Sequence, residues 1–308
     1  IQGYDAQVGN KVYRTFAAAL AGAEADATIK LLRNIDISNT KIEKSITIDG
    51  NGYTITTDEG TSTAKHTFEI DGEATEVTFR NISSLVHMRR GMIVSANIPT
   101  TLTMENVNID ATQAPVSNEY ALFNLLGKDG TTNLIWDHVT VDMDATAAGK
   151  DSNVAIIRTG NADEKVVNIT LTDCDLNTEG AEGRHGITII SKTTAVLNLT
   201  RTNITTFDVL PIKDNTGNAT INKTDCTLTY TGVEASIGNN LYKTFATSRR
   251  FLLARNTDIR IFPLKRTAKN QARYPAFPFA NLPPNPRWNP QRIVPRSPRT
   301  NLPPNFPR

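Results

Sequence analysis

Apolar residues alternate with polar ones in six similar segments of the chain, and a polar pair interrupts each segment near its middle. The segments are VTFRNIS from Val77, LTMENVNI from Leu102, LIWDHVTV from Leu134, ITLTDCDL from Ile169, LNLTRTNI from Leu197 and INKTDCTL from Ile221. They begin 25, 32, 35, 28 and 24 residues apart. Alternation with a period of two is typical of strands with one buried face, so each segment predicts two short strands separated by a bend.

A second class of apolar segment precedes most of these copies. Its members are GMIVSAN from Gly91, ALFNLLG from Ala121, VAIIRTG from Val154, GITIISK from Gly186 and VLPIKDN from Val209. No helical pattern lies between the strands, so each period predicts one coil of about three short strands rather than a βαβ unit. The pattern predicts an all-β fold, a right-handed parallel β-helix over residues 1–232.

The N-terminal residues predict a cap for this solenoid. Thr15 is a suitable helix N-cap, and the following FAAALAGA places Phe16, Leu20 and Ala23 on one stripe. We expect a short amphipathic helix over about residues 15–25 that covers the first coil. The next strands are expected at residues 28–32 and 45–48.

Equivalent positions in stacked coils form columns spaced by about 4.8 Å. One inward column contains Ile82, Val107, Val139, Cys174, Thr202 and Cys226, which makes the two cysteines buried thiols two coils apart and beyond disulfide reach. The polar-bend column contains Asn81, Asn106, His138, Asp173 and Asp225. Asn and Asp tolerate left-handed backbone geometry, so this column predicts a structural ladder.

The opening YRTFAAALAGAEADATIKLLRNIDIS…KSITIDGNGYTIT resembles the start of pectate-lyase-like parallel β-helix domains in bacterial surface and secreted proteins. The resemblance covers about residues 4–232. It implies a capping helix that leads into the first coils, and an extracellular or cell-surface location. Such coils occur in lyases, glycosidases and adhesins, so the resemblance leaves the activity open.

The start of the module occurs twice. Residues 234–246, EASIGNNLYKTFA, align without gaps to residues 5–17, DAQVGNKVYRTFA, with seven identities. We therefore interpret residues 233–246 as the start of a second, truncated copy, and the chain as part of a longer tandem-module protein.

Residues 247–308 have a different composition from the rest of the chain. They carry 13 Lys and Arg against one acidic residue, Asp258, whereas residues 1–246 carry 20 against 30. All 18 Gly precede residue 247 and 12 of the 15 Pro follow it. A basic arm for nucleic acid is one interpretation. We favour a disordered or frame-shifted Pro/Arg-rich tail without a nucleic-acid role, because many prolines oppose helix and sheet alike.

Few residues in the sequence are candidates for binding or cleaving a polysaccharide. Alignment of the second strand class places Ser95, Asn124, Arg158, Ser191 and Lys213 near one column, with Lys192 beside it. Arg158, Lys192 and Lys213 are the candidate binding residues for an acidic glycan, and a solvated edge is the alternative interpretation of the same strip. A lyase would need one of these bases beside loop carboxylates that hold Ca²⁺.

No cofactor or metal site is predicted outside that lyase alternative. The four histidines are scattered, and the turn Asp49-Gly50-Asn51-Gly52 has one carboxylate where a calcium loop needs several. Residues 177–186 and 211–214 weakly resemble polygalacturonase motifs, but Glu179 replaces an aspartate and the intervening Asp pair is missing. His185 within that segment is expected in a surface loop.

These features predict a non-catalytic extracellular module of a repetitive bacterial surface protein, with an adhesive, structural or glycan-contacting role. The alternative is an enzyme, a pectate-lyase-like β-eliminase or a glycoside hydrolase, that acts on acidic polysaccharide. The sequence has no phosphate-binding glycine loop and no apolar run of the length that spans a bilayer.

Overall fold

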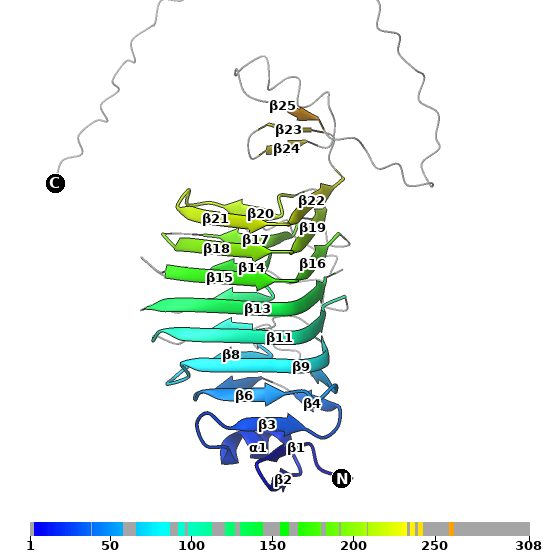
Figure 1. Ribbon diagram of the computed structural model, residues 1–308, viewed down its shortest axis with the longest axis vertical. Helices are drawn as coiled ribbons and strands as arrows, with labels where there is room; N and C mark the ends of the chain where they lie inside the picture. The colour runs from blue at the N-terminus through cyan, green and yellow to red at the C-terminus, as the bar shows by residue number, and fades with distance from the viewer. Residues whose placement is uncertain are drawn as a thin grey trace, which may run out of the picture. The chain divides into compact units, whose positions relative to one another are not determined.

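Each turn of the chain contributes short strands to three faces of a parallel β-solenoid, and successive turns stack in parallel register (Figure 1). This computed structural model confirms the predicted all-β parallel β-helix with its N-terminal helix. The chain divides into two compact units after Leu264, and every described residue lies in the first unit. The structure describes residues 3–37, 39–57, 66–86, 92–95, 98–112, 121–126, 130–143, 155–159, 166–179, 183–190, 192–207, 209–232, 235–237, 240–242 and 259–261.

Face A contains the first strand of each turn. Its members are β3 (Thr28–Leu31), β6 (Ile46–Asp49), β9 (Glu76–Val86), β11 (Thr100–Asp110), β13 (Thr131–Asp142), β15 (Val166–Thr172), β18 (Thr194–Thr200) and β21 (Ala219–Thr224). The six predicted copies pair in the predicted alignment, from Val77 with Leu102 through to Leu197 with Ile221. Their shared spacing of apolar residues therefore sets the register of the stack.

Face B follows face A around a bend. It contains β4 (Ile35–Ile37), β7 (Thr54–Thr57), β16 (Asp175–Thr178), β19 (Asn203–Phe207), β22 (Thr227–Thr231) and the second halves of β9, β11 and β13. In most coils the bend separates two strands, whereas the three longest strands, β9, β11 and β13, continue through it.

Face C is a separate seven-stranded parallel sheet, which contains the five predicted members of the second strand class and two earlier strands, β5 (Thr40–Ile42) and β8 (Phe68–Ile70). The five predicted members are β10 (Met92–Val94), β12 (Phe123–Leu125), β14 (Ala155–Thr159), β17 (His185–Ile189) and β20 (Ile212–Asp214). Its inward side chains meet those of face A, as the edge-to-face contact of Phe123 with Trp136 shows at 4.8 Å between ring centroids. A continuous apolar core therefore runs between the faces.

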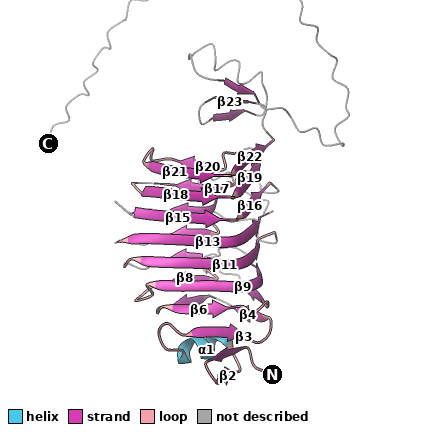
Figure 2. Cartoon of the chain, in the orientation of Figure 1, coloured by secondary structure: helices cyan, strands magenta, loops and turns pink. Residues whose placement is uncertain are grey.

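The N-terminal end of the core is closed by α1 (Phe16–Gly22), which is the one helix among the described residues (Figure 2). Thr15 caps it as predicted, because its side chain accepts a hydrogen bond from the backbone N–H of Ala18. The helix buries Phe16 and Ala19. A hairpin of β1 (Ala6–Val8) and β2 (Lys11–Tyr13) precedes the helix, and β1 pairs antiparallel with β3.

A second small sheet follows the last coil. It contains β23 (Ala235–Ile237), β24 (Asn240–Tyr242) and β25 (Ile259–Ile261) in the order β24-β23-β25. Apart from β25, the predicted Pro/Arg-rich tail at residues 247–308 lies outside the described residues. No described helix is both long enough and apolar enough to cross a membrane.

Candidate functional site

The predicted basic strip lies on face C, where the strand register corrects part of the predicted column. Asn124 is opposite Arg158, Arg158 is opposite Thr188, and Thr188 is opposite Lys213. Ile93 therefore stands in the column where Ser95 was expected, and Thr188 stands where Ser191 was expected. The alignment was wrong for Ser95 because Ile93 is apolar, so the alternation of polar and apolar residues does not define the register of this segment. Lys192 follows the end of β17 and is exposed.

Burial separates Arg158 from the two lysines. Asn124 lies between the core residues Phe123 and Leu125, so it and its column partners point to the outer side of the sheet. Arg158 is nevertheless only 8% exposed, and Thr188 is fully buried. The solvated-edge interpretation is therefore wrong for Arg158, although Lys213 is half-buried and Lys192 remains in solvent.

This column also contains unsatisfied polar atoms. The Asn124 Oδ1 and Thr188 Oγ1 atoms are buried and make no hydrogen bond among the described residues. Buried polar atoms in folded proteins are usually paired, so these two atoms distinguish the outer side of face C from an ordinary solvated sheet surface.

His185 corrects a second prediction. It opens strand β17 rather than a surface loop, is 5% exposed, and places its Nδ1 atom 2.7 Å from the Leu210 carbonyl oxygen. The neighbouring Arg184 is also buried, and burial lowers the pKa of its guanidinium to about 10. Strand β17 begins one residue before the apolar GITIISK segment from which it was predicted. The pattern of apolar residues therefore gave no indication that Arg184 and His185 are buried.

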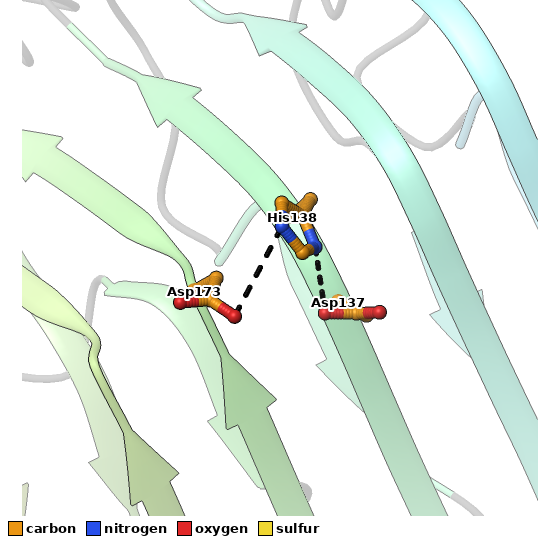
Figure 3. A group of neighbouring side chains, drawn as sticks. All are labelled: Asp137, His138 and Asp173. Carbon is orange, nitrogen blue, oxygen red and sulfur yellow. Dashed lines mark hydrogen bonds and ion pairs between the residues drawn. The ribbon is translucent and has the colours of Figure 1, made fainter.

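A carboxylate and histidine cluster lies at a different place, on the bend between faces A and B (Figure 3). Asp137, His138 and Asp173 are the one group of three or more His, Cys, Asp or Glu side chains in the described chain that could share a metal ion. Their ligand atoms lie within 4.8 Å of one another. This cluster was not predicted as a unit, although alignment had placed His138 and Asp173 in one column.

Backbone geometry explains most of this cluster. Asn81, Asn106, His138, Asp173, Arg201 and Asp225 all have φ between +46° and +54°. The predicted structural ladder is confirmed, because each coil turns its bend through one left-handed residue and Asn and Asp adopt that conformation most readily. Arg201 is the exception to that preference.

The charges in the cluster are already partly matched. His138 Nδ1 lies 2.8 Å from Asp137 Oδ1, and its Nε2 lies 4.0 Å from Asp173 Oδ2. Arg201 donates two hydrogen bonds of 2.6 Å to the two carboxylate oxygens of Asp173, which holds the pKa of Asp173 below its usual range. A cation at this bend would have to displace the guanidinium, so the geometry favours an exposed ion-pair ladder.

The Asp49 turn shows the same use of carboxylates. Asp49 Oδ1 accepts hydrogen bonds from the Asn51 backbone N–H and the Asn81 side chain, and its Oδ2 accepts one from Arg80 Nε. Burial opposes ionisation, but these hydrogen bonds prevail and keep the pKa of Asp49 below its ordinary value. Both carboxylate oxygens of Asp49 are therefore occupied by hydrogen bonds that stabilise the turn, in agreement with its interpretation as a tight turn.

Both cysteines are free, as predicted, but the predicted burial holds for Cys174 alone, because Cys226 lies in the last coil and is only partly buried. Cys174 is buried, its Sγ donates to the Thr172 and Trp136 carbonyls, and burial raises its pKa to about 11. Thr202 and Cys226 stand above it in the same column and each donates to the carbonyl two residues before it. Each of the three side chains therefore uses a backbone carbonyl as its hydrogen-bond acceptor, and Cys174 is an unreactive thiol at neutral pH.

No known protein family, curated protein or solved structure matches this chain. The parallel β-solenoid is shown by the strand register, and the likeness to pectate-lyase-like domains remains one of sequence pattern.

Proposed function

We propose that the chain is a non-catalytic β-helix module of a repetitive extracellular bacterial surface protein, where it has a structural, adhesive or glycan-contacting role. The observation that carries the proposal is the repeated module start. In the first hairpin Ala6 pairs with Tyr13, and in the second Ala235 pairs with Tyr242. The second hairpin repeats the first in sequence and in register, as the start of another module would.

The outer side of face A supports contact with a repetitive polymer. Asn133 donates a hydrogen bond to Thr101, Asn168 donates to Asn133, and Asn222 donates to Asn198. These side chains offer hydroxyl and amide groups once per coil along the solenoid. Lys213 on face C and Lys192 after β17 offer positive charge for contact with an acidic glycan, and Arg158, which is 8% exposed, is the third residue that we propose, as a buried charge that attracts the glycan without broad contact.

A polysaccharide lyase would need a base and several carboxylates around one point. The described carboxylate cluster lies on the bend between faces A and B, whereas Arg158 and Lys213 lie on face C. This separation supports the non-catalytic role over a lyase that uses Arg158 or Lys213 with calcium.

The test combines turnover with binding. The full chain is incubated with polygalacturonate or alginate and calcium, and the absorbance of unsaturated product is followed. We expect no product, and binding to acidic glycans on an array that weakens in Lys213→Ala. Lys30→Ala, which removes an exposed lysine from β3 on face A, is the matched control. Product formation that Arg158→Ala or Lys213→Ala abolishes would establish the enzyme instead.

A further inference from the structure

The two ends of the solenoid differ in how well their interior is covered. At the N-terminal end, Ile29 and Leu31 of the first coil are fully buried beneath α1 and the first hairpin. At the C-terminal end, Ile221 is 37% exposed, although the five residues below it in the same inward column, from Val77 to Leu197, are fully buried. The last coil therefore presents its interior to solvent.

Other residues of the last coil confirm that this end is open. Lys223 is exposed at the position that Leu199 fills in the preceding coil, and Cys226 and Leu228 are only partly buried. Among the described strands, β20, β21 and β22 each pair on one side only. Unpaired strand edges next to apolar side chains invite another strand, so such an end requires a cover.

The second hairpin stands next to this end in the sequence. Three residues, 232–234, separate β22 from β23. Four peptide units reach about 14 Å at most, so the hairpin must begin within a few strand spacings of the last coil.

The order of strands indicates which edge of the hairpin faces the last coil. In the first module β2 is outermost, and the coils stack on the far side of β1 through β3. In the second sheet β25 pairs antiparallel with β23, just as β3 pairs with β1 in the first module. When the two hairpins are aligned in sequence, the register of the β25 pairing differs by one residue from that of β3. Strand β24 therefore corresponds to β2, the hairpin strand that lies on the side away from the coils of its own module.

We propose that the open end of each solenoid is the docking surface for the hairpin and capping helix of the following module, whose free edge strand pairs with the last coil. This inference rests on the tandem arrangement in the proposed function. It extends that function, because docked modules form a stiff rod. In the present chain the sequence after Ala246 differs from the alanine-rich helix segment of the first copy.

Cys226 provides a reporter for this surface. It lies in the last coil, whereas the other cysteine, Cys174, is buried and unreactive. The test compares the 308-residue chain with a tandem chain in which residues 1–246 are followed by residues 18–232, which completes the second copy. Both cysteines of the added copy are changed to threonine, the residue that already occupies their column at Thr202.

The labelling rate of Cys226 with a thiol reagent at pH 8 is the measurement. We expect it to be at least about tenfold slower in the tandem chain, because docking shields the last coil. Leu241→Pro in β24 of the tandem chain should restore fast labelling, since proline breaks an edge strand that must pair. Equal rates in the tandem and 308-residue chains would overturn the proposal.

A second comparison does not depend on folding of the added copy. In the 308-residue chain, where the last coil is open, Leu241→Pro and Leu253→Pro should both leave the labelling rate of Cys226 unchanged, so an effect of Leu241→Pro is expected in the tandem chain alone. Unlabelled Cys174 in every variant confirms that the solenoid itself remains folded, and slow labelling of Cys226 in the 308-residue chain would contradict an open last coil. Neither measurement involves a glycan, so its failure is distinct from failure of glycan contact.

Discussion

Single residues in the left-handed conformation turn the chain at the bend between faces A and B. Most are Asn or Asp, whose short polar side chains tolerate positive φ, but His138 and Arg201 occupy the same position with φ of +53° and +46°. Histidine is also enriched in this conformation, whereas arginine is not. The presence of Arg201 indicates that the bend is imposed by the stack of coils rather than by each residue's own preference.

Substitution of His138 should reveal this conformational cost. We expect His138→Val to lower the free energy of unfolding by about 1–2 kcal/mol, because a β-branched side chain clashes with the backbone at positive φ. His138→Asn should match or exceed the wild type. Urea denaturation followed by circular dichroism gives both values, and a valine variant as stable as the asparagine variant would contradict this explanation.

The pair of Asp173 and Arg201 should be visible in a titration. Hydrogen bonds from Arg201 lower the pKa of Asp173 in the folded chain, so the pair stabilises the fold above the ordinary carboxyl pKa. That contribution is lost as the pH falls through the lowered pKa. In Arg201→Ala, NMR titration should show the Asp173 pKa rising toward its ordinary value, while that of Asp49 stays low. An unchanged Asp173 pKa would exclude the guanidinium as the cause.

Strand β17 shows how closely neighbouring elements pack at the transition from face B to face C. A Cβ atom on Gly186 would lie 2.3 Å from Ile204 Cγ2 and 2.9 Å from the Pro211 carbonyl oxygen. The chain can pass this point only without a side chain. The glycine is therefore required by contact between strands of two successive coils.

We predict that Gly186→Ala lowers the free energy of unfolding by about 1–3 kcal/mol, the usual cost of forcing extra volume into a packed core. Gly217→Ala is the comparison, because a Cβ there meets no neighbour and the cost comes from its φ of +70° alone. Chemical denaturation should show cooperative unfolding of both variants. If Ile204→Ala does not relieve the Gly186→Ala defect, the clash is not its cause.

In the whole solenoid, we expect the local stability of each coil to depend on whether it has a neighbouring coil on both sides. Strands β11, β13 and β15 have a neighbour on both sides in face A, whereas β21 has one. In a stack where each coil contacts only its neighbours, the least covered terminal coil opens first.

Hydrogen exchange with peptide-level mass spectrometry should show this gradient. We expect amides of residues 219–224 to exchange well before those of residues 100–110 and 131–142, because opening the last coil breaks one ladder rather than two. The N-terminal strand β3 serves as the control, since the hairpin covers its outer edge. Faster exchange at β3 than at β21 would contradict the inference that the C-terminal end is open.

The sequence by itself determined the architecture of this protein. Its inward residues repeat with strand alternation, so the positions of Val77, Leu102, Leu134, Ile169 and Leu197 fixed which segments stack and which side chains enter the core. The helix cap at Thr15, the free cysteines and the left-handed bends followed from local chemistry in the same way.

Tertiary structure alone decided where the polar side chains on the outer side lie and how deeply they are buried. The apolar Ile93 occupies a column of otherwise polar residues, so alignment misplaced Ser95, and Ser191 was misplaced as well. Strand β17 begins before the apolar segment that predicted it, so His185 was assigned to a surface loop. The burial of Arg158 and the pairing of Asp173 with Arg201 depend on side chains that are distant in sequence. Such relations arise only when coils stack, because a local pattern records which face a residue occupies and not what covers it.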